Sequence, residues 1–236
     1  MSGHSKWATT KRAKEVKDAR RSGLFTKLAK NITIAARAGA DPETNFKLRM
    51  AMDKARAQSM PKDNIARAIK SGSGLGEGAQ IESLVYEAYG PAGVALIIEA
   101  LTDNKNRAVA NLKHILAKHN GNLASSGSVL WMFERKGEII IAKDKLSEEE
   151  ELEIIEAGAE DLLTDNEGEI RIITNLDALE KVKNNLQVKG LTIKSSELSY
   201  VPKEKLKTED PEKLLSLLDA LDDDDDVNNI YTNVDI

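Results

Sequence analysis

Basic side chains are concentrated near the N-terminus at a spacing that suits contact with phosphate groups. Lysine and arginine neutralise phosphates and gain affinity by releasing condensed counterions, so this cluster predicts binding to a polyanion such as nucleic acid. Lys-rich helices are also often plain solvated surfaces, and Trp7 could pack beneath the helices instead of stacking on a base. The predicted nucleic-acid-binding residues are Lys6, Trp7, Lys11, Arg12, Lys14, Lys17, Arg20, Arg21, Lys27 and Lys30.

The charge of the chain is divided unevenly along its 236 residues. Residues 1–70 contain 17 Lys+Arg and 6 Asp+Glu, a net charge of +11, whereas residues 71–236 contain 17 and 33, a net charge of −16. The overall charge of −5 is the small difference between these two parts. Self-repulsion within so basic a segment is costly unless a polyanion relieves it, so residues 1–70 are the expected interface.

A polar turn at residues 102–107 is a second candidate site. One interpretation is a strand-to-helix turn in which Asp103 or Asn104 caps the following helix. The other is a helix N-terminus that accepts a phosphate or another anion, and the two can coexist. The residues of this possible anion-binding loop are Asp103, Asn104, Lys105, Asn106 and Arg107.

Five consecutive aspartates, Asp222–Asp226, follow an apolar helical segment near the C-terminus. The run is weak as a metal site, because consecutive carboxylates do not converge on one ion without a suitable loop geometry. It can be a solvated acidic turn. The alternative is a patch that repels nucleic acid or docks a basic partner, including the protein's own first domain.

Catalytic signatures are sparse, and we expect no enzyme, no metal and no cofactor. The chain has no cysteine, which excludes disulfides, thiolate catalysis and Cys-ligated metals. His114 and His119 are five residues apart and fall on opposite faces of a helix. No nucleophile elbow, phosphate-binding lysine loop or zinc-protease motif is present. The Gly74-x-Gly76 segment lacks the strand and helix that a dinucleotide fingerprint needs, so it is interpreted as linker.

The first 74 residues are expected to form a basic helical domain. Gly23 predicts a break between helices, and apolar residues three and four apart predict a helix over 24–38. The Asp41-Pro42-Glu43 triplet predicts the start of a third helix that ends near Ser59. Pro61 predicts a fourth helix over Lys62–Lys70. Residues 71–78, rich in Gly and Ser, read as a linker.

Beyond the linker, the pattern predicts an α+β organisation. Segments 81–89 and 94–101 alternate as a hairpin around Gly90–Gly93, and Asn106–His119 reads as an amphipathic helix. Val129–Glu134 is expected to be an interior strand. Trp131 and Phe133 have the alternation that base stacking on a strand needs, but packing in the core is the favoured interpretation. Residues 135–205 then read as βαββαβ, the ferredoxin-like order. This unit contains no aromatic residue between 135 and 199, which excludes base stacking on its strands.

The end of the chain supplies elements that the middle part lacks. Residues 79–134 provide ββαβ, and residues 206–236 add a helix and a short strand. We therefore expect an α+β multidomain fold with three domains. They are a basic helical domain at 1–74, a discontinuous middle α+β domain at 79–134 plus 206–236, and a ferredoxin-like domain at 135–205 inserted into it.

Several motifs along the whole chain resemble the YebC/PmpR family. The segments that carry the resemblance are Gly3–Trp7, Met60–Ile65, Tyr86–Pro91, Thr102–Arg107, Gly158–Asp161 and Asp224–Val227. The family usually has glycine at the positions of Ala88 and Ala92. We therefore expect that neither alanine requires a positive φ in this chain.

The resemblance implies a three-domain cytoplasmic protein that acts as a transcriptional regulator and binds DNA. Mitochondrial relatives act instead as translational activators associated with the ribosome. The residues do not choose between these targets, because both are rich in phosphate and no base-reading pattern is visible. An enzyme on nucleic acid, with Asp103 or the aspartate run holding magnesium, is a third and weaker hypothesis.

The predicted function is thus a non-enzymatic regulator of gene expression that binds DNA. The alternative is a ribosome-associated translation factor that binds messenger or ribosomal RNA through the same basic domain. The chain is expected to be monomeric. No stretch approaches 18 consecutive apolar residues and the first residues lack the apolar core of a signal peptide, so no membrane partner is expected and the cytoplasm is the expected location.

Overall fold

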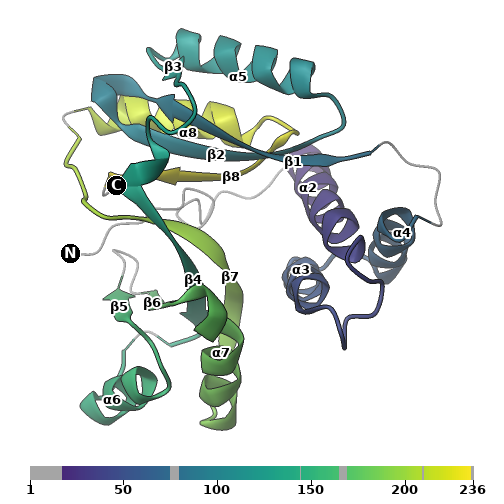
Figure 1. Ribbon diagram of the computed structural model, residues 1–236, viewed down its shortest axis with the longest axis vertical. Coiled ribbons are helices and arrows are strands. Elements are labelled where there is room, and N and C mark those ends of the chain that lie inside the picture. The colour runs from purple at the N-terminus through teal and green to yellow at the C-terminus, as the bar shows by residue number, and fades with distance from the viewer. Residues whose placement is uncertain (1–17, 75–79, 144, 165–168, 209, 235–236) are drawn as a thin grey trace.

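The computed structural model describes residues 18–74, 80–143, 145–164, 169–208 and 210–234 (Figure 1). These residues form a helical bundle, a middle sheet and a second sheet, each with its own apolar core. In the view of Figure 1, the bundle lies at the right and the second sheet lies below the middle sheet. The mixed α+β architecture predicted from the sequence is confirmed.

The bundle consists of α2 (Asp18–Ala36), α3 (Phe46–Ala57) and α4 (Lys62–Gly72). Apolar residues recur three and four positions apart, which places them on one face of each helix. The bundle core contains Leu28, Ile32, Ala36, Leu48, Met52, Ala55, Met60, Ile65 and Ala68. The predicted helical faces of residues 24–38 and 62–70 are therefore confirmed.

Two predicted helix boundaries in the bundle are wrong. Helix α2 continues through Gly23, because one glycine lowers helix stability without forcing a break. Helix α3 begins at Phe46, since Asp41 accepts a hydrogen bond from the Glu43 amide at 2.9 Å and forms a turn. Asn45 is the cap instead, and its side chain accepts a hydrogen bond from the Leu48 amide at 3.1 Å.

The middle sheet has the strand order β3-β1-β2-β8, and all neighbouring strands are antiparallel. Its strands are β1 (Glu82–Tyr89), β2 (Ala95–Thr102), β3 (Asn122–Leu123) and β8 (Val227–Thr232). Helices α5 (Lys105–Lys118) and α8 (Pro211–Asp222) pack on one face of this sheet and share its apolar core (Figure 1). The last strand of the chain thus joins the hairpin formed by β1 and β2.

The second sheet has the order β5-β6-β4-β7, again with antiparallel neighbours. It contains β4 (Phe133–Ile141), β5 (Asp161–Thr164), β6 (Ile170–Thr174) and β7 (Ile193–Pro202), with α6 (Glu148–Glu156) and α7 (Leu179–Val188). This connectivity is the predicted ferredoxin-like βαββαβ order. The division into three domains, with the last inserted into the middle one, stays a prediction.

The interior strand expected at Val129–Glu134 is not formed. Residues Leu130–Met132 make a single 3₁₀ turn, and Phe133 begins β4 in the second sheet, so the boundary expected after Glu134 falls inside a strand. Phe133 is buried, whereas 63% of Trp131 is exposed. The amides of Val129 and Leu130 donate hydrogen bonds to the carboxylate of Glu87. In a strand, such amides would donate to the backbone of a neighbouring strand.

Ala92 corrects another expectation, because its φ is +57° and its ψ is 22°, in the left-handed region. An L side chain costs about 1–2 kcal/mol there, and glycine avoids that cost. Ala92→Gly is therefore expected to raise the free energy of unfolding by about 0.5–1 kcal/mol, measured by urea denaturation.

Ala88 provides the matched control. It lies within β1, is fully buried and does not have a positive φ. Ala88→Gly should lower the free energy of unfolding, because it removes a buried methyl group and loosens a strand. A urea midpoint that falls for both variants would contradict the assignment of strain at Ala92.

Candidate nucleic-acid interface

Two of the predicted phosphate-binding lysines, Lys27 and Lys30, contact the aspartate run. Lys27 Nζ donates to the backbone oxygen of Asp222 and lies 3.4 Å from its Oδ1. Lys30 Nζ donates to the backbone oxygen of Asp225 and to Oδ1 of Asp226, both at 2.9 Å. The structure therefore places these two lysines in an interface between α2 and the turn after α8.

Asp226 is the centre of this interface. Its side chain is 5% exposed and lies 2.9 Å from both Lys30 Nζ and a guanidinium nitrogen of Arg107. Burial by itself would raise the pKa of Asp226, but hydrogen bonds from Lys30 and Arg107 outweigh burial and hold the pKa below its usual range. Both interpretations of the aspartate run hold for part of it. Asp222 and Asp226 contact the basic helical bundle, whereas Asp223 and Asp225 are exposed, as a solvated acidic turn predicts.

The turn at residues 102–107 takes part in the same contact. Asn104 caps α5, because its side chain accepts a hydrogen bond from the Arg107 amide at 3.1 Å. The Arg107 guanidinium donates to Asp103 Oδ1 at 2.7 Å and to Asp226. These hydrogen bonds, the ones to Asp226 more than the one to Asp103, raise the pKa of Arg107. The capping interpretation is confirmed, and the anions that Arg107 contacts are carboxylates of this chain.

The other residues of this turn and of the basic cluster have different positions. Lys105 and Asn106 are exposed in the first turn of α5. Arg20 and Arg21 lie in α2, whose side chains are described from Ser22 onward. The predicted contacts outside the described residues are Lys6, Trp7, Lys11, Arg12, Lys14 and Lys17.

A further set of exposed cations on the bundle was missed by sequence reasoning. On α4, Lys62 and Lys70 are two turns apart on the same exposed side, and Arg67 is exposed close by. Arg67 donates to the side chain of Asn64 at 3.1 Å. Lys62, Arg67 and Lys70 are five and three positions apart in the sequence, but the denser cluster at residues 6–30 drew the prediction there instead. The exposed basic residues of the described bundle include Arg37, Lys47, Arg56, Lys62, Arg67 and Lys70.

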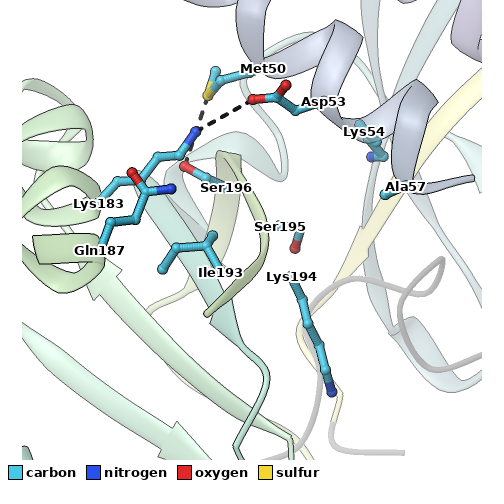
Figure 2. A pocket seen from close by; sticks show the side chains of 10 residues that line it. All are labelled: Met50, Asp53, Lys54, Ala57, Lys183, Gln187, Ile193, Lys194, Ser195 and Ser196. Atoms are coloured by element: carbon cyan, nitrogen blue, oxygen red, sulfur yellow. Dashed lines mark hydrogen bonds and ion pairs between the residues drawn. The ribbon is translucent and has the colours of Figure 1, made fainter. Parts of the chain in front are cut away.

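A cleft of about 190 Å³ lies between the bundle and the second sheet (Figure 2). Its lining includes three lysines, and each of them faces a carboxylate. Lys54 Nζ is 2.8 Å from Glu197. Lys183 Nζ is 3.8 Å from Asp53, and Lys194 Nζ is 3.6 Å from Glu169. The first two pairs join α3 to β7 and α7, and the third lies within the second sheet and its flanking residues. Each of these lysines is thus balanced by a carboxylate of the same chain.

The described residues contain neither a cluster of metal-ligating side chains nor a helix suited to a membrane. There, no three His, Asp or Glu side chains come together in a way that could hold a metal ion. His119 lies 3.3 Å from the hydroxyl of Ser216 through its Nδ1. No helix in the same part of the chain combines the length and apolarity needed to span a bilayer.

The fold and the charged contacts together define a basic helical bundle that is joined by ion pairs to two antiparallel α+β units. The family model of the TACO1/YebC N-terminal domain matches residues 5–75, and that of the TACO1/YebC second and third domains matches residues 81–234. The chain therefore belongs to the TACO1/YebC family, as the resemblance predicted.

Individual relatives agree with this assignment. A protein of Chloroherpeton thalassium named "Probable transcriptional regulatory protein" is 50% identical, over 100% of this chain and 96% of its own. A relative with the same name from Pelodictyon phaeoclathratiforme is 48% identical over the same shares. The crystal structure of a conserved hypothetical protein from Aquifex aeolicus superposes with a TM-score of 0.84 at 41% identity, covering 94% of each chain.

Proposed function

We propose that the protein is a non-enzymatic regulator of gene expression that binds nucleic acid, with DNA as the first target, through its N-terminal domain. The observation that carries this proposal is the net charge of +11 in residues 1–70. Exposed cations on α4 carry part of that charge, and the relatives' printed names support a role in regulation. The proposed location is the cytoplasm, with the protein acting as a monomer.

Binding should depend steeply on salt. If the domain neutralises about six phosphates, its affinity for duplex DNA should fall roughly 1,000-fold between 50 and 200 mM salt. The reason is that counterion release gains less free energy when the surrounding salt concentration is higher. Fluorescence anisotropy with a labelled duplex measures this slope. Replacing Lys11, Arg12, Lys14 and Lys17 with glutamate should abolish binding, and replacing Lys62, Arg67 and Lys70 should weaken it.

Controls with the same change of charge test whether the location of the cations matters. Lys113, Lys118, Lys145 and Lys181 are exposed on the two α+β units, so their replacement by glutamate matches the fourfold reversal. The control should retain most of the binding. Equal losses in both sets would mean that overall charge, and not the N-terminal domain, determines affinity.

The same titrations with structured RNA distinguish the kind of target. Tighter binding to RNA than to duplex DNA would favour a regulator of translation over a regulator of transcription. The N-terminal domain would remain the proposed interface. Crosslinking in cells, followed by identification of the attached nucleic acid, gives the same distinction for the full-length protein. Absence of salt-sensitive binding to either polymer would overturn the proposal.

A further inference from the structure

Trp131 is a large aromatic side chain held in an ordered but open position. It lies in the 3₁₀ turn Leu130–Met132, and 63% of its surface is exposed. Its indole Nε1–H donates a hydrogen bond to the backbone oxygen of Ser128 at 2.9 Å. The ring is thus restrained on its polar edge, while much of its apolar surface faces solvent.

The segment that carries Trp131 is fixed by a buried carboxylate. Glu87, which is 7% exposed, accepts hydrogen bonds from the amides of Gly127 at 2.6 Å, Val129 at 2.6 Å and Leu130 at 2.7 Å. Desolvation acts to raise the pKa of Glu87, but these three amides outweigh it and lower the pKa. A charged group is therefore buried where it orders the turn that exposes the tryptophan.

A lysine-bearing segment runs beside the same turn. The pairing of Phe133 with Pro202 is extended by a hydrogen bond from the Lys203 amide to the Met132 oxygen at 2.9 Å. The Leu206 amide in turn donates to the Asn233 oxygen at 2.7 Å, so the backbone of the segment is held at two points. Its exposed basic side chains are Lys203, Lys205 and Lys207.

The charges around Trp131 favour an anionic ligand. Residues 134–136 and 203–207 contain five basic residues and the two acids Glu134 and Glu204. Lys136 pairs with Glu134 and with Glu160, so the positive charge beside the turn comes mainly from Arg135 and the 203–207 segment. Single-stranded nucleic acid combines flat bases, which stack on exposed aromatic rings, with phosphates that lysines contact. An exposed ring held by a hydrogen bond, next to a lysine-bearing segment, meets both requirements, whereas duplex DNA keeps its bases stacked on one another.

We propose that Trp131 is a stacking platform for an unpaired nucleobase, and that the 203–207 segment contacts the phosphates beside that base. The residues of this surface lie outside the N-terminal domain in the sequence, and the proposal goes beyond the proposed function. Stacking of one base on an aromatic side chain is worth a 5- to 150-fold change in affinity, roughly 1–3 kcal/mol. Trp131→Ala should therefore weaken binding of single-stranded nucleic acid by roughly that factor.

The test uses the full chain with Trp7→Phe, so that Trp131 is its one remaining tryptophan. Oligothymidylate of about 12 nucleotides is the probe, and an abasic strand of the same length is its control. Oligothymidylate should quench Trp131 fluorescence, and the abasic strand should quench it much less. Trp131→Phe should retain most of the affinity that Trp131→Ala loses, measured by anisotropy, with unchanged thermal unfolding for both.

The outcomes separate this proposal from the proposed function. Binding of the oligonucleotide without quenching, or with equal affinity after Trp131→Ala, overturns the platform and assigns that binding to another surface. Quenching that persists when duplex binding is absent supports the platform and counts against the N-terminal interface. Replacing Lys203 and Lys207 with glutamate should reduce the affinity for both the normal and the abasic strand, because it acts on phosphate contacts.

Discussion

Replacement of Arg171 by leucine is expected to lower the free energy of unfolding by about 3–5 kcal/mol. Arg171 is 4% exposed in β6, with its guanidinium 2.8 Å from Glu138 and 3.2 Å from Glu169. Both carboxylates are themselves buried, with side chains 2% exposed. Leucine would leave two negative charges at the centre of the second sheet with their shared cation removed, which is far costlier than losing a surface pair.

Urea denaturation at neutral pH measures this loss. Arg56→Leu is the matched control, because Arg56 pairs with Asp53 at an exposed position. That control should change the free energy of unfolding by less than about 1 kcal/mol. Combining Arg171→Leu with leucine at Glu138 and Glu169 should recover much of the loss, since no buried charge would remain from the cluster. A small effect of Arg171→Leu alone would refute this account.

The second large effect is expected at Asp226. Asp226→Asn should lower the free energy of unfolding by about 3 kcal/mol near neutral pH, because Lys30 and Arg107 would lose a buried anionic partner. The folded state lowers the pKa of Asp226, so the wild-type contribution is present above the unfolded pKa of about 3.9. It is lost as the pH falls through the lower folded pKa.

The difference between wild type and Asp226→Asn should therefore shrink in acid. Urea denaturation at neutral pH and at a series of acidic pH values follows this change. Asp225→Asn is the control, because the Asp225 side chain is exposed and the hydrogen bond from Lys30 reaches its backbone oxygen. This control should have an effect within about 0.5 kcal/mol. A pH-independent loss at Asp226 would contradict the electrostatic explanation.

Periodicity in the sequence was sufficient for much of the fold. Leu28 and Ile32 are buried one turn apart, as their spacing predicts, and the ferredoxin-like order was correct because each of its elements carries its own apolar face. Helix starts were less predictable. Asp41 and Asn45 can both cap a helix, and the choice depends on Asn45 also donating to the oxygens of Ala35 and Gly39.

The individual partners of long-range contacts could not be predicted from the sequence, although docking of the aspartate run on the basic segment was one of the alternatives. Lys27 lies 195 residues from Asp222, and nothing near Lys27 shows that an aspartate will contact it. The position of Trp131 was predicted wrongly for a similar reason. Its alternation with Val129 and Phe133 is typical of a strand, but the amides of Val129 and Leu130 donate hydrogen bonds to the distant Glu87 carboxylate instead of to a neighbouring strand. The phosphate-binding role of the N-terminal cluster stays a prediction.

The middle sheet also has a consequence for folding during synthesis. Asn229 in β8 contacts Glu99 in β2 across 130 residues of chain, and α8 supplies Leu214, Leu217, Leu218 and Leu221 to the same core. At translation rates of about 5–20 residues per second, β8 is synthesised roughly 6–26 s after β2. The second sheet lies between residues 133 and 202, so its strands are all synthesised before β8. A nascent chain can therefore hold a complete second sheet while the middle sheet is still unfinished. The open edge and the apolar face of the middle sheet need protection until α8 and β8 have emerged.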